Sequence, residues 1–372
     1  MYGTNGQCGW HNEALDDGPS VILGRKGMGN LGVEWCSGPF WVIDTAYFVI
    51  PKTDALDLRF FYYLIGYIGL NHLKDGTSNP SLSRDTFAAQ LLPFPPMEIQ
   101  QTIAETLAYI DDKIEQNRRT ARVLERLTRA IFRAWFVDFE PVKAKAAGAT
   151  AFPSMPQPVF DALPTRFVDS EIGPVPEGWV VKAVSEAFDV NPTRSLRKSE
   201  RAPYLDMKNM PTNGHAPDSW IERPFGSGMR FMNGDTLVAR ITPCLENGKT
   251  SFVDFLEDGQ IAWGSTEYIV LRPLPPLPPL FAYCLARTDE FRDFAIQNMT
   301  GTSGRQRVAS TAMDHFRLAV PSEEVAVEFG EIMNPMFDCI RGGMEESRKL
   351  AEMRDYLLPK LLSGLIRVEA AP

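Results

Sequence analysis

The chain has 372 residues, of which 44% are hydrophobic and 23% are charged, and its formal net charge at pH 7 is −9. This length accommodates two or three domains with ordinary cores, and the negative charge argues against nonspecific nucleic-acid binding by the whole surface while permitting a local basic face. No apolar run reaches the ~20 residues that a spanning helix needs, and no signal sequence is recognisable, so we expect a cytoplasmic protein without a membrane partner.

Cysteine and histidine are few and scattered. The five cysteines form no CxxC pair, and the four histidines have no second ligand type at metal spacing. We therefore predict neither a disulfide framework nor a metal site in this chain.

Residues 1–97 are predicted to form a first α+β domain. Short β-rich runs at 20–24 and 42–50 are separated by Gly, Pro and Asn, and a helix is expected from Leu58 to Leu73. This order of short strands followed by a helix is typical of an α+β fold.

A long amphipathic helix is predicted from 98 to 136, within a spacer element delimited as 98–140. Alternating steps of four and three residues connect a stripe that extends over more than four heptads, the spacing of a coiled-coil seam. A helix cannot bury such a seam without a partner. The seam includes Ile103, Leu107, Ile110, Ile114, Asn117, Leu124 and Ile131.

The stretch 141–176 is rich in Pro and Ala and has little periodicity. This composition predicts a linker between domains rather than a core element.

Residues 177–321 repeat the first domain, and 322–365 repeat the long helix. The seam recurs at an offset of 226 residues, from Ile103 to Phe329, and it supplies the missing partner. Pro335 predicts a kink or a helix start, and Gly343 corresponds to Asn117 near the middle of the seam, where a small or polar residue can fix register. The second seam includes Met333, Met336, Ile340, Gly343, Leu350 and Leu357.

The repeat extends into the globular parts. SVILGRKG (20–27) corresponds to DTLVARIT (235–242), which pairs Arg25 with Arg240, and Gly76-Thr77-Ser78 corresponds to Gly301-Thr302-Ser303. The two openings are unequal, because about sixty residues separate Trp179 from Arg240 whereas twenty-four precede Arg25. We expect the first domain to be shortened at its start, either by loss of strands or because the gene begins upstream, and to leave a sheet edge uncovered.

Each candidate catalytic motif lies in a sequence context that does not suit the chemistry of that motif. Residues 27–32 fit GxGxxG but no helix follows, so a turn is favoured over a dinucleotide site. Asn334-Pro335-Met336-Phe337 resembles the NPPF of adenine methyltransferases, but it lies on the seam and no glycine-rich cofactor motif precedes it. There is no GxxxxGK[ST] and no set of nucleophile, base and orienting group, so we predict no catalytic residues.

Each domain contributes loops that combine Arg or Lys with small hydroxyl and amide side chains, a mixture suited to phosphates and base edges. The ~48 Å of helix between Ile103 and Trp135 could separate two such loops on one duplex, where successive turns are ~34 Å apart. For any single residue the alternative is a solvated surface charge. The predicted DNA-binding residues are Arg25, Lys26, Lys74, Thr77, Ser78, Asn79, Arg84, Arg194, Arg197, Lys198, Arg240, Asn247, Lys249, Thr302, Ser303, Arg305, Gln306 and Arg307.

Over essentially its whole length the chain resembles the specificity (S) subunit of type I restriction-modification enzymes. The stretches that carry the resemblance include LPFPPMEIQQTIAETLAYIDDKIEQN, AIFRAWFVDFEPVKAKAAG, FVDSEIGPVPEGW, GTSGRQRV and RDYLLPKLLSGLIRV. One departure is that the opening which ends in a tryptophan, as in GPVPEGW, is missing from the first copy.

The resemblance implies an α+β protein with two target recognition domains and two long helices packed as an antiparallel coiled coil that serves as a ruler. It implies a non-catalytic subunit that reads a bipartite sequence in double-stranded DNA and recruits two modification (M) subunits and restriction (R) subunits. S-adenosylmethionine, Mg and ATP are expected on those partners, with no cofactor in this chain. The outward face of the first helix, with Glu115, Arg118, Arg122 and Glu125, is the expected docking surface for the M subunits.

Two other functions remain open at this point. The chain could be an assembly scaffold for the M subunits with impaired or half-site DNA reading, in which case replacing Arg305 and Arg307 would leave methylation unchanged. A methyltransferase is a third reading, but it would require an NPPF motif and a glycine-rich motif that this chain does not contain.

Overall fold

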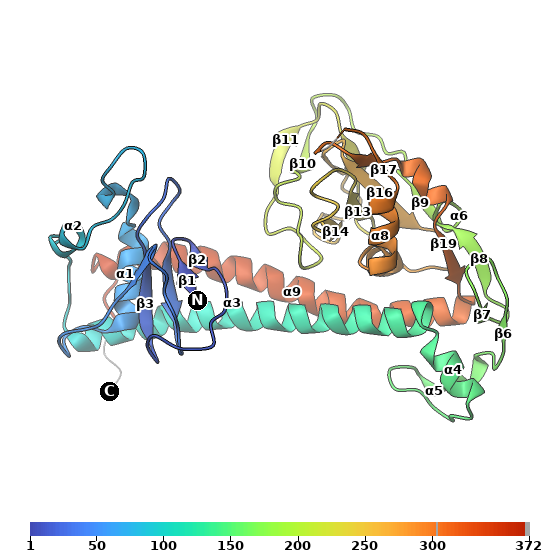
Figure 1. Ribbon diagram of the computed structural model, residues 1–372, viewed down its shortest axis with the longest axis horizontal. Coiled ribbons are helices and arrows are strands. Elements are labelled where there is room, and N and C mark those ends of the chain that lie inside the picture. The colour runs from blue at the N-terminus through green and yellow to red at the C-terminus, as the bar shows by residue number, and fades with distance from the viewer. Residues whose placement is uncertain (303, 369–372) are drawn as a thin grey trace. The chain divides into compact units, whose positions relative to one another are not determined.

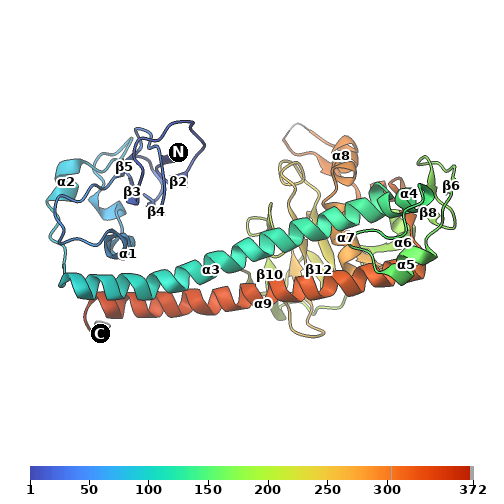
Figure 2. The ribbon, with the colours of Figure 1, turned by 90° about the horizontal axis from the view of Figure 1, so that it is seen from below.

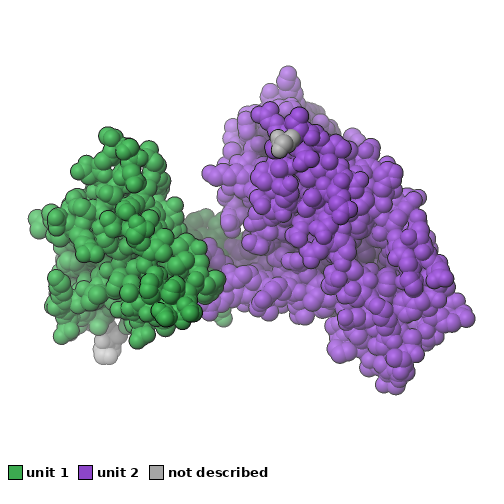
Figure 3. All heavy atoms as spheres, in the orientation of Figure 1, with its two compact units in different colours: residues 1–116, 345–372 green, residues 117–344 purple. Residues whose placement is uncertain are grey.

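The computed structural model describes residues 1–302 and 304–368, so the predicted contact residue Ser303 lies outside the described residues. The chain divides into two compact units (Figure 3). Unit 1 contains residues 1–116 and 345–372, and unit 2 contains residues 117–344. Each unit is a mixture of strands and helices, which confirms the α+β class. Both long helices contribute to both units.

The sheet of unit 1 is built around a buried central strand, β3 (Ser20–Gly24), which pairs antiparallel with β4 (Val33–Cys36) and β5 (Ala46–Phe48). Because side chains alternate along a strand, Val21 and Leu23 pack in one core cluster with Phe61 and Ile65 of the helix α1, whereas Ile22 packs in another. A small hairpin of β1 (Tyr2–Gly3) and β2 (Gly6–Gln7) precedes this sheet.

The helix predicted at 58–73 ends earlier than expected. Asp57 caps the N-terminus of α1 (Leu58–Ile68) by accepting a hydrogen bond from the Phe60 N–H, and Gly69 ends the helix with φ of 72°. A single 3-10 turn, η1 (Asn71–Leu73), follows. A short helix, α2 (Arg84–Ala88), is capped by Ser83.

The first long helix is α3 (Met97–Phe132), continued by a π-helical turn, η2 (Arg133–Val137), and the second is α9 (Glu323–Leu362). Both agree with the predicted ranges. Of the two alternatives predicted at Pro335, a kink or a helix start, the helix start is excluded because α9 runs through this residue. The buried Met333 and Phe337 on either side of the proline hold the helix in the core, so the loss of one backbone donor does not end it.

Within each unit, segments of α3 and α9 contact each other (Figures 1 and 2). In unit 1, Ile103 and Leu107 share a core cluster with Leu361, and Asp111 accepts a hydrogen bond from Arg354 over 2.8 Å. In unit 2, Ile131 shares a cluster with Met333 and Ile340. Other predicted seam positions are also buried or half-buried: Ile110, Ile114, Asn117, Leu124, Met336, Gly343, Leu350 and Leu357.

Unit 2 contains two four-stranded sheets. One has the order β14-β13-β16-β9 and the other β11-β10-β15-β12. The strands of the first are β9 (Phe188–Val190), β13 (Thr236–Ala239), β14 (Thr250–Phe252) and β16 (Tyr268–Pro273). Those of the second are β10 (Arg201–Leu205), β11 (Ile221–Pro224), β12 (Met229–Phe231) and β15 (Ala262–Gly264).

Smaller elements complete unit 2. A two-stranded ladder joins β8 (Val180–Ala183) to β19 (Arg317–Val320), and the helix α6 (Val184–Ala187) connects β8 to β9. A second ladder joins β17 (Met299–Thr300) to β18 (Arg307–Val308), and the 3-10 helix η3 (Ser310–Asp314) follows.

By analogy with the helix at 58–73, the sequence predicts a single helix from Leu280 to Met299 in the second copy, but the structure has two helices, α7 (Pro279–Ala286) and α8 (Asp289–Gln297). Arg287 is the C-cap of the first, and Thr288 caps the second by accepting a hydrogen bond from the Phe291 N–H over 3.3 Å. The α7 side chains are buried on all sides, which removed the amphipathic pattern that would have shown its end.

The prediction that 141–176 is a linker rather than a core element was wrong. The stretch forms α4 (Glu140–Ala146), α5 (Gln157–Ala162) and the ladder of β6 (Phe167–Val168) with β7 (Val175–Pro176). Val142, Phe160 and Val175 are at most 2% exposed and belong to the largest core cluster of unit 2. These apolar residues are irregularly spaced, so no periodicity signalled their burial.

Candidate nucleic-acid interface

Arg25 and Arg240 occupy the same position in two matching frameworks. The Arg25 N–H donates to the Thr45 carbonyl over 2.9 Å, and the Arg25 carbonyl accepts from the Leu82 N–H over 2.7 Å. In unit 2, the Arg240 N–H donates to the Glu267 carbonyl over 3.0 Å, and its carbonyl accepts from the Val308 N–H over 2.9 Å. Each arginine therefore follows the central strand of its sheet and lies between the same two neighbouring segments.

The loops that begin at Gly76-Thr77 and Gly301-Thr302 also occupy matching positions. The Gly27 N–H donates to the Pro80 carbonyl, and the Thr242 N–H donates to the Gln306 carbonyl, each over 3.0 Å. Gly76 has φ of 99° and Gly301 has φ of 124°, a region that favours glycine. These bonds bring residues 77–81 beside Arg25 and Lys26, and residues 302 and 304–307 beside Arg240, as the repeat had indicated.

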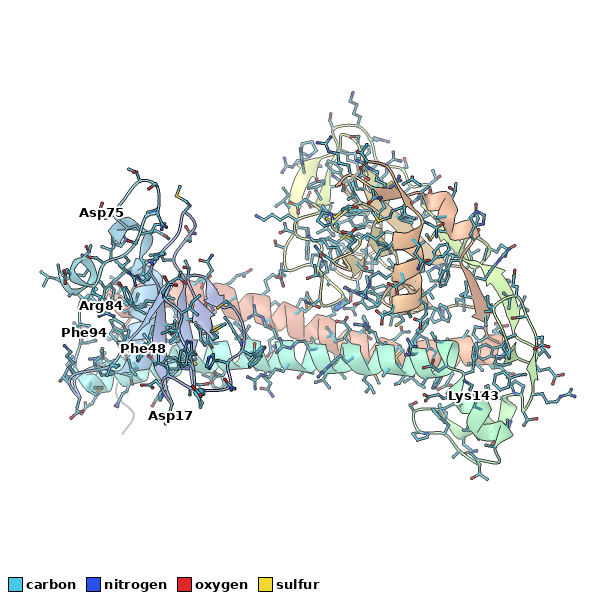
Figure 4. All side chains as sticks on the ribbon, viewed as in Figure 1. Asp17, Phe48, Asp75, Arg84, Phe94 and Lys143 are labelled. Atoms are coloured by element: carbon cyan, nitrogen blue, oxygen red, sulfur yellow. The ribbon has the colours of Figure 1, made fainter. Side chains whose placement is uncertain are left out.

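In unit 1, the two arginines of the site contact one tyrosine. The guanidinium carbons of Arg25 and Arg84 lie 4.8 and 5.3 Å from the centroid of the Tyr47 ring. Both side chains are thus oriented by cation–π contact. Arg84, which is labelled in Figure 4, is exposed. Thr77, Ser78 and Asn79 in the adjacent loop are also exposed.

The two lysines of unit 1 have different partners. Lys26 forms an ion pair with Asp44 over 3.0 Å, and the hydrogen bond from its ammonium lowers the pKa of that carboxyl group. The Lys74 ammonium donates to the carbonyls of Gly27 and Gly29, over 3.3 and 2.8 Å. Lys74 therefore supports the turn that carries Lys26, which is a structural role.

In unit 2, two arginines converge on one carboxylate. Arg307 Nε donates to Glu267 Oε1 over 2.9 Å, and Arg240 Nε lies 3.7 Å from Glu267 Oε2. The Glu267 side chain is 23% exposed, and its carboxylate balances part of the positive charge of Arg240 and Arg307. Glu267 is not among the residues predicted from the sequence to form the site. Its position directly before β16, which matches the position of Thr45 before β5, is the signal that could have identified it.

The remaining predicted residues of unit 2 are placed in several ways. Thr302, Arg305 and Asn247 are exposed, and Gln306 is half-buried. The Lys249 ammonium donates to the Met207 and Lys208 carbonyls over 2.6 and 3.1 Å, so it holds a loop much as Lys74 does. Arg197 and Lys198 are exposed on a loop that has no counterpart among the described residues of unit 1.

The assignment of Arg194 to a DNA contact is corrected by its burial. Its guanidinium pairs with the Asp235 carboxylate over 2.5 Å, and the two side chains are 9% and 0% exposed. Asp235 also accepts from Arg272 over 2.7 Å. Removing this arginine from its partner would leave a buried carboxylate incompletely compensated, so Arg194 stabilises the fold.

Glu125 does not belong to the outward face of α3. Its carboxylate accepts a hydrogen bond from the buried Tyr283 hydroxyl over 2.6 Å, and the residue is 8% exposed. Arg287 donates to the same hydroxyl and, through its two terminal nitrogens, to the carbonyls of Gly248 and Thr250 on either side of Lys249. The expected docking surface therefore excludes Glu125.

Among the described residues, no group of three or more His, Cys, Asp or Glu side chains is placed to hold a metal ion. Residues 1–302 and 304–368 also contain no helix that is both long and apolar enough to cross a membrane.

Comparison with known proteins gives consistent matches. Residues 11–126 match the family described as "Type I restriction modification DNA specificity domain". The chain is 24% identical to the type I restriction enzyme MjaIX specificity subunit of Methanocaldococcus jannaschii over 86% of this chain and 72% of that protein. It is 23% identical to the HindI specificity subunit of Haemophilus influenzae, over 88% and 81% of the two chains.

A solved structure shows the same fold. The S subunit of a type I restriction-modification system from M. genitalium aligns with a TM-score of 0.60 at 15% identity, covering 97% of this chain and 87% of that one. The family match and the two relatives confirm the resemblance to specificity subunits that the sequence indicated. The solved structure agrees with it in fold.

Proposed function

We propose that this chain, a member of the specificity-subunit family of type I restriction-modification systems, reads a bipartite sequence in double-stranded DNA without catalysing a reaction itself. The observation that carries this proposal is the recurrence of one arginine site in both units. Arg25 and Arg240 each follow a central strand, are fixed by the same pair of backbone hydrogen bonds, and lie beside a Gly-Thr loop.

The chemistry of the two sites suits DNA. Exposed hydroxyl and amide groups at Thr77, Asn79 and Thr302 adjoin guanidinium groups, and this combination can bind phosphates and read base edges. Because the net charge of the chain is −9, binding would depend on the local basic groups at the two sites, such as Arg25 and Arg240.

The two long helices are the proposed spacer. We infer that α3 and α9 form an antiparallel coiled coil, because residue pairs such as Asp111 with Arg354 and Asn117 with Gly343 run in opposite directions along the two helices. The proposed domains are 1–97 and 177–321 for recognition, with 98–140 and 322–365 as spacer helices. The outward faces of these helices are the proposed docking surface for two M subunits, with R subunits joining the complex.

Cofactors belong to the partners in this proposal. S-adenosylmethionine would be bound by the M subunits, and ATP and Mg would serve the R subunits.

The test is DNA binding by the complex of this chain with its M subunits. The duplex should carry the motif that is methylated in the genome, and a scrambled duplex of the same length is the control. We expect a shift of the first duplex only, with affinity that falls steeply as salt rises because counterions are released from phosphates. Equal binding to both duplexes would contradict the proposal.

A second candidate is a scaffold with half-site reading, favoured by one observation. The loop with Arg197 and Lys198 has no counterpart among the described residues of unit 1, so the two sites are unequal. Duplexes mutated in one half of the motif distinguish the candidates. Half-site reading predicts that mutations in one half leave the affinity unchanged, whereas full reading predicts a loss for either half.

A further inference from the structure

One arginine of unit 2 uses every N–H group of its guanidinium to bind the protein. Arg287 Nε donates to the Tyr283 hydroxyl over 3.3 Å. Each of its two terminal nitrogens donates to two backbone carbonyls, over 2.8 Å to Thr212, 2.5 Å to Gly214, 2.9 Å to Gly248 and 2.9 Å to Thr250. The planar fork of donors is particular to arginine, so a lysine could not make this set of bonds.

These bonds hold a loop of the candidate interface. The β13–β14 loop (residues 240–249) begins with Arg240. Gly248, one of the residues that Arg287 binds, lies near the end of this loop and directly follows the exposed Asn247. Arg287 therefore fixes the backbone of the loop that carries two of the predicted contact residues.

The same arginine is joined to the long helix α3 in two ways. The Tyr283 hydroxyl, which accepts from Arg287, donates to the Glu125 carboxylate over 2.6 Å. The Arg129 guanidinium donates to the backbone carbonyl of Arg287 over 3.2 Å. Glu125 and Arg129 are four residues apart in the helix, so they lie on one face of α3. This face is therefore linked to both the side chain and the backbone of Arg287.

The chemistry of the three side chains fixes the direction of each hydrogen bond. Because a guanidinium can only donate, the Tyr283 oxygen accepts from Arg287 and gives its own proton to Glu125. Glu125 is 8% exposed and Tyr283 is 0% exposed. Removing one member would leave a buried polar group without its partner, so the chain of bonds is costly to disturb.

A related bond occurs in unit 1. Tyr63 of α1 corresponds to Tyr283 of α7, because each follows a phenylalanine at a spacing of two residues in its helix. The Tyr63 hydroxyl donates to the Asp111 carboxylate of α3 over 2.7 Å. A hydrogen bond from a tyrosine to a carboxylate of α3 is thus common to the two units.

We propose that Arg287 is a positioning residue for DNA reading by unit 2. It couples the β13–β14 loop to α3 through Tyr283 and Glu125, so that the helix sets the position of Asn247 and Arg240. This inference rests on the proposed DNA-reading function. Side chains of a binding site must be held to within about 0.5 Å, and a loop meets this demand only when supporting bonds fix its backbone.

The test measures sequence discrimination by the complex of the full chain with its M subunits. Discrimination is the ratio of the affinity for the duplex with the methylated motif to the affinity for a duplex with one substituted base pair. One such duplex is substituted in the half of the motif that Arg240→Ala relaxes, and another in the other half. Arg287→Lys keeps the charge and loses the fork of donors. We expect it to lower discrimination about tenfold in the first half, which is the scale of one base contact, and to leave the other half unchanged.

Variants at the α3 end of the chain of bonds test the coupling. Glu125→Gln and Tyr283→Phe should each lower discrimination in the same half of the motif. Combining either with Arg287→Lys should have less than the summed effect, because residues of one hydrogen-bond network are not additive. Arg133→Lys is the matched control and should discriminate normally, because Arg133 joins α3 to Glu290 of α8 over 2.9 Å, outside this chain of bonds.

Hydrogen exchange and urea denaturation establish whether each variant folds and where its backbone loosens. In Arg287→Lys we expect faster exchange of the backbone amides in 211–215 and 240–250, with the global unfolding transition retained. If Arg287→Lys does not fold, Tyr283→Phe, which keeps the buried ring, decides the question.

Unchanged discrimination in a folded Arg287→Lys or Tyr283→Phe variant would overturn the proposal. An equal loss in both halves of the motif, or an equal loss in Arg133→Lys, would overturn it as well. Failure of the DNA-reading function gives a different result, because the unaltered complex would then bind the motif and the scrambled duplex equally and Arg240→Ala would relax neither half.

Discussion

The side-chain amide of Asn117 donates a hydrogen bond to the backbone carbonyl of Gly343 over 3.2 Å, and the two residues are 226 positions apart. This separation is also the offset between the two repeats. In the antiparallel coiled coil that we propose for α3 and α9, a residue would face its own repeat equivalent only at the midpoint of the pairing. The Asn117–Gly343 hydrogen bond is the contact expected at that midpoint.

Close approach at this point predicts a difference between two adjacent glycines. A Cβ atom at Gly343 would lie 3.5 Å from Asn117 Cβ, whereas at Gly342 it would meet nothing within 4 Å. A Cβ at 3.5 Å is in ordinary van der Waals contact, so the atoms of a leucine beyond its Cβ must displace Asn117, and Gly343→Leu should destabilise unit 2 by about 1–3 kcal/mol through overpacking. Gly342→Leu should be neutral or stabilising by up to about 1 kcal/mol, because Leu favours the helix more than Gly does. Chemical denaturation of the two variants checks this, and equal effects would contradict the placement.

Arg240 and Arg307 should contribute to DNA affinity through a common site. Replacing either with Ala in the complex with M subunits should weaken binding to the specific duplex by about 1–3 kcal/mol if it reads a base, or reduce the salt slope by about 1 if it binds phosphate. Arg166→Ala is the control, because Arg166 forms a similar ion pair with Glu177 over 2.7 Å elsewhere on unit 2. If Arg166→Ala weakened DNA binding as much as the other two substitutions, the assignment of Arg240 and Arg307 to the DNA-binding site would be contradicted.

Arg194 should affect folding before it affects recognition. Arg194→Ala leaves Asp235, which is 0% exposed, with Arg272 as its remaining charged partner. Breaking a buried pair in this way costs about 3–5 kcal/mol. We expect a large loss in the free energy of unfolding of unit 2, measured in urea. If Arg194→Ala left the stability normal but abolished DNA binding, Arg194 would belong to the DNA-binding site.

Tyr283 predicts an alkaline limit to the stability of unit 2. Burial raises the pKa of its hydroxyl well above the ordinary value. The Arg287 guanidinium lowers this pKa in part, and the Glu125 carboxylate raises it. A group with a raised pKa in the folded state contributes stability that is complete below its unfolded pKa of about 10 and is lost as pH rises above it. Tyr283→Phe should lessen the loss of stability above that pH, measured by urea denaturation at several pH values. An equally steep loss of stability with rising pH in the Tyr283→Phe variant and in the unaltered protein would contradict this role of Tyr283.

The features shared by the two repeats could be predicted from the sequence, because a pattern found in one copy could be checked against the other copy. Arg25 and Arg240 agree in their backbone hydrogen bonds, and Gly76 and Gly301 agree in having a positive φ. The long helices were predicted closely for a similar reason, since a seam sustained over several heptads has a strong periodic signal.

Features that depend on long-range pairing could not be predicted. Arg194 and Asp235 are 41 residues apart and nothing local marks them as a pair. Glu125 lies among solvated charges in the helix sequence, and its partner Tyr283 is 158 residues away. In 141–176, burial follows from tertiary contacts of isolated side chains such as Phe160, which no local pattern anticipates.

The most direct test of two reading sites in one chain is the methylated motif in genomic DNA, compared among cells with the gene, without it, and with single substitutions. We expect a methylated motif of two specific parts separated by an unspecified spacer. Cells without the gene should lack this methylation. Arg25→Ala should relax one part and Arg240→Ala the other. A single contiguous motif, or relaxation of the same part by both substitutions, would contradict it.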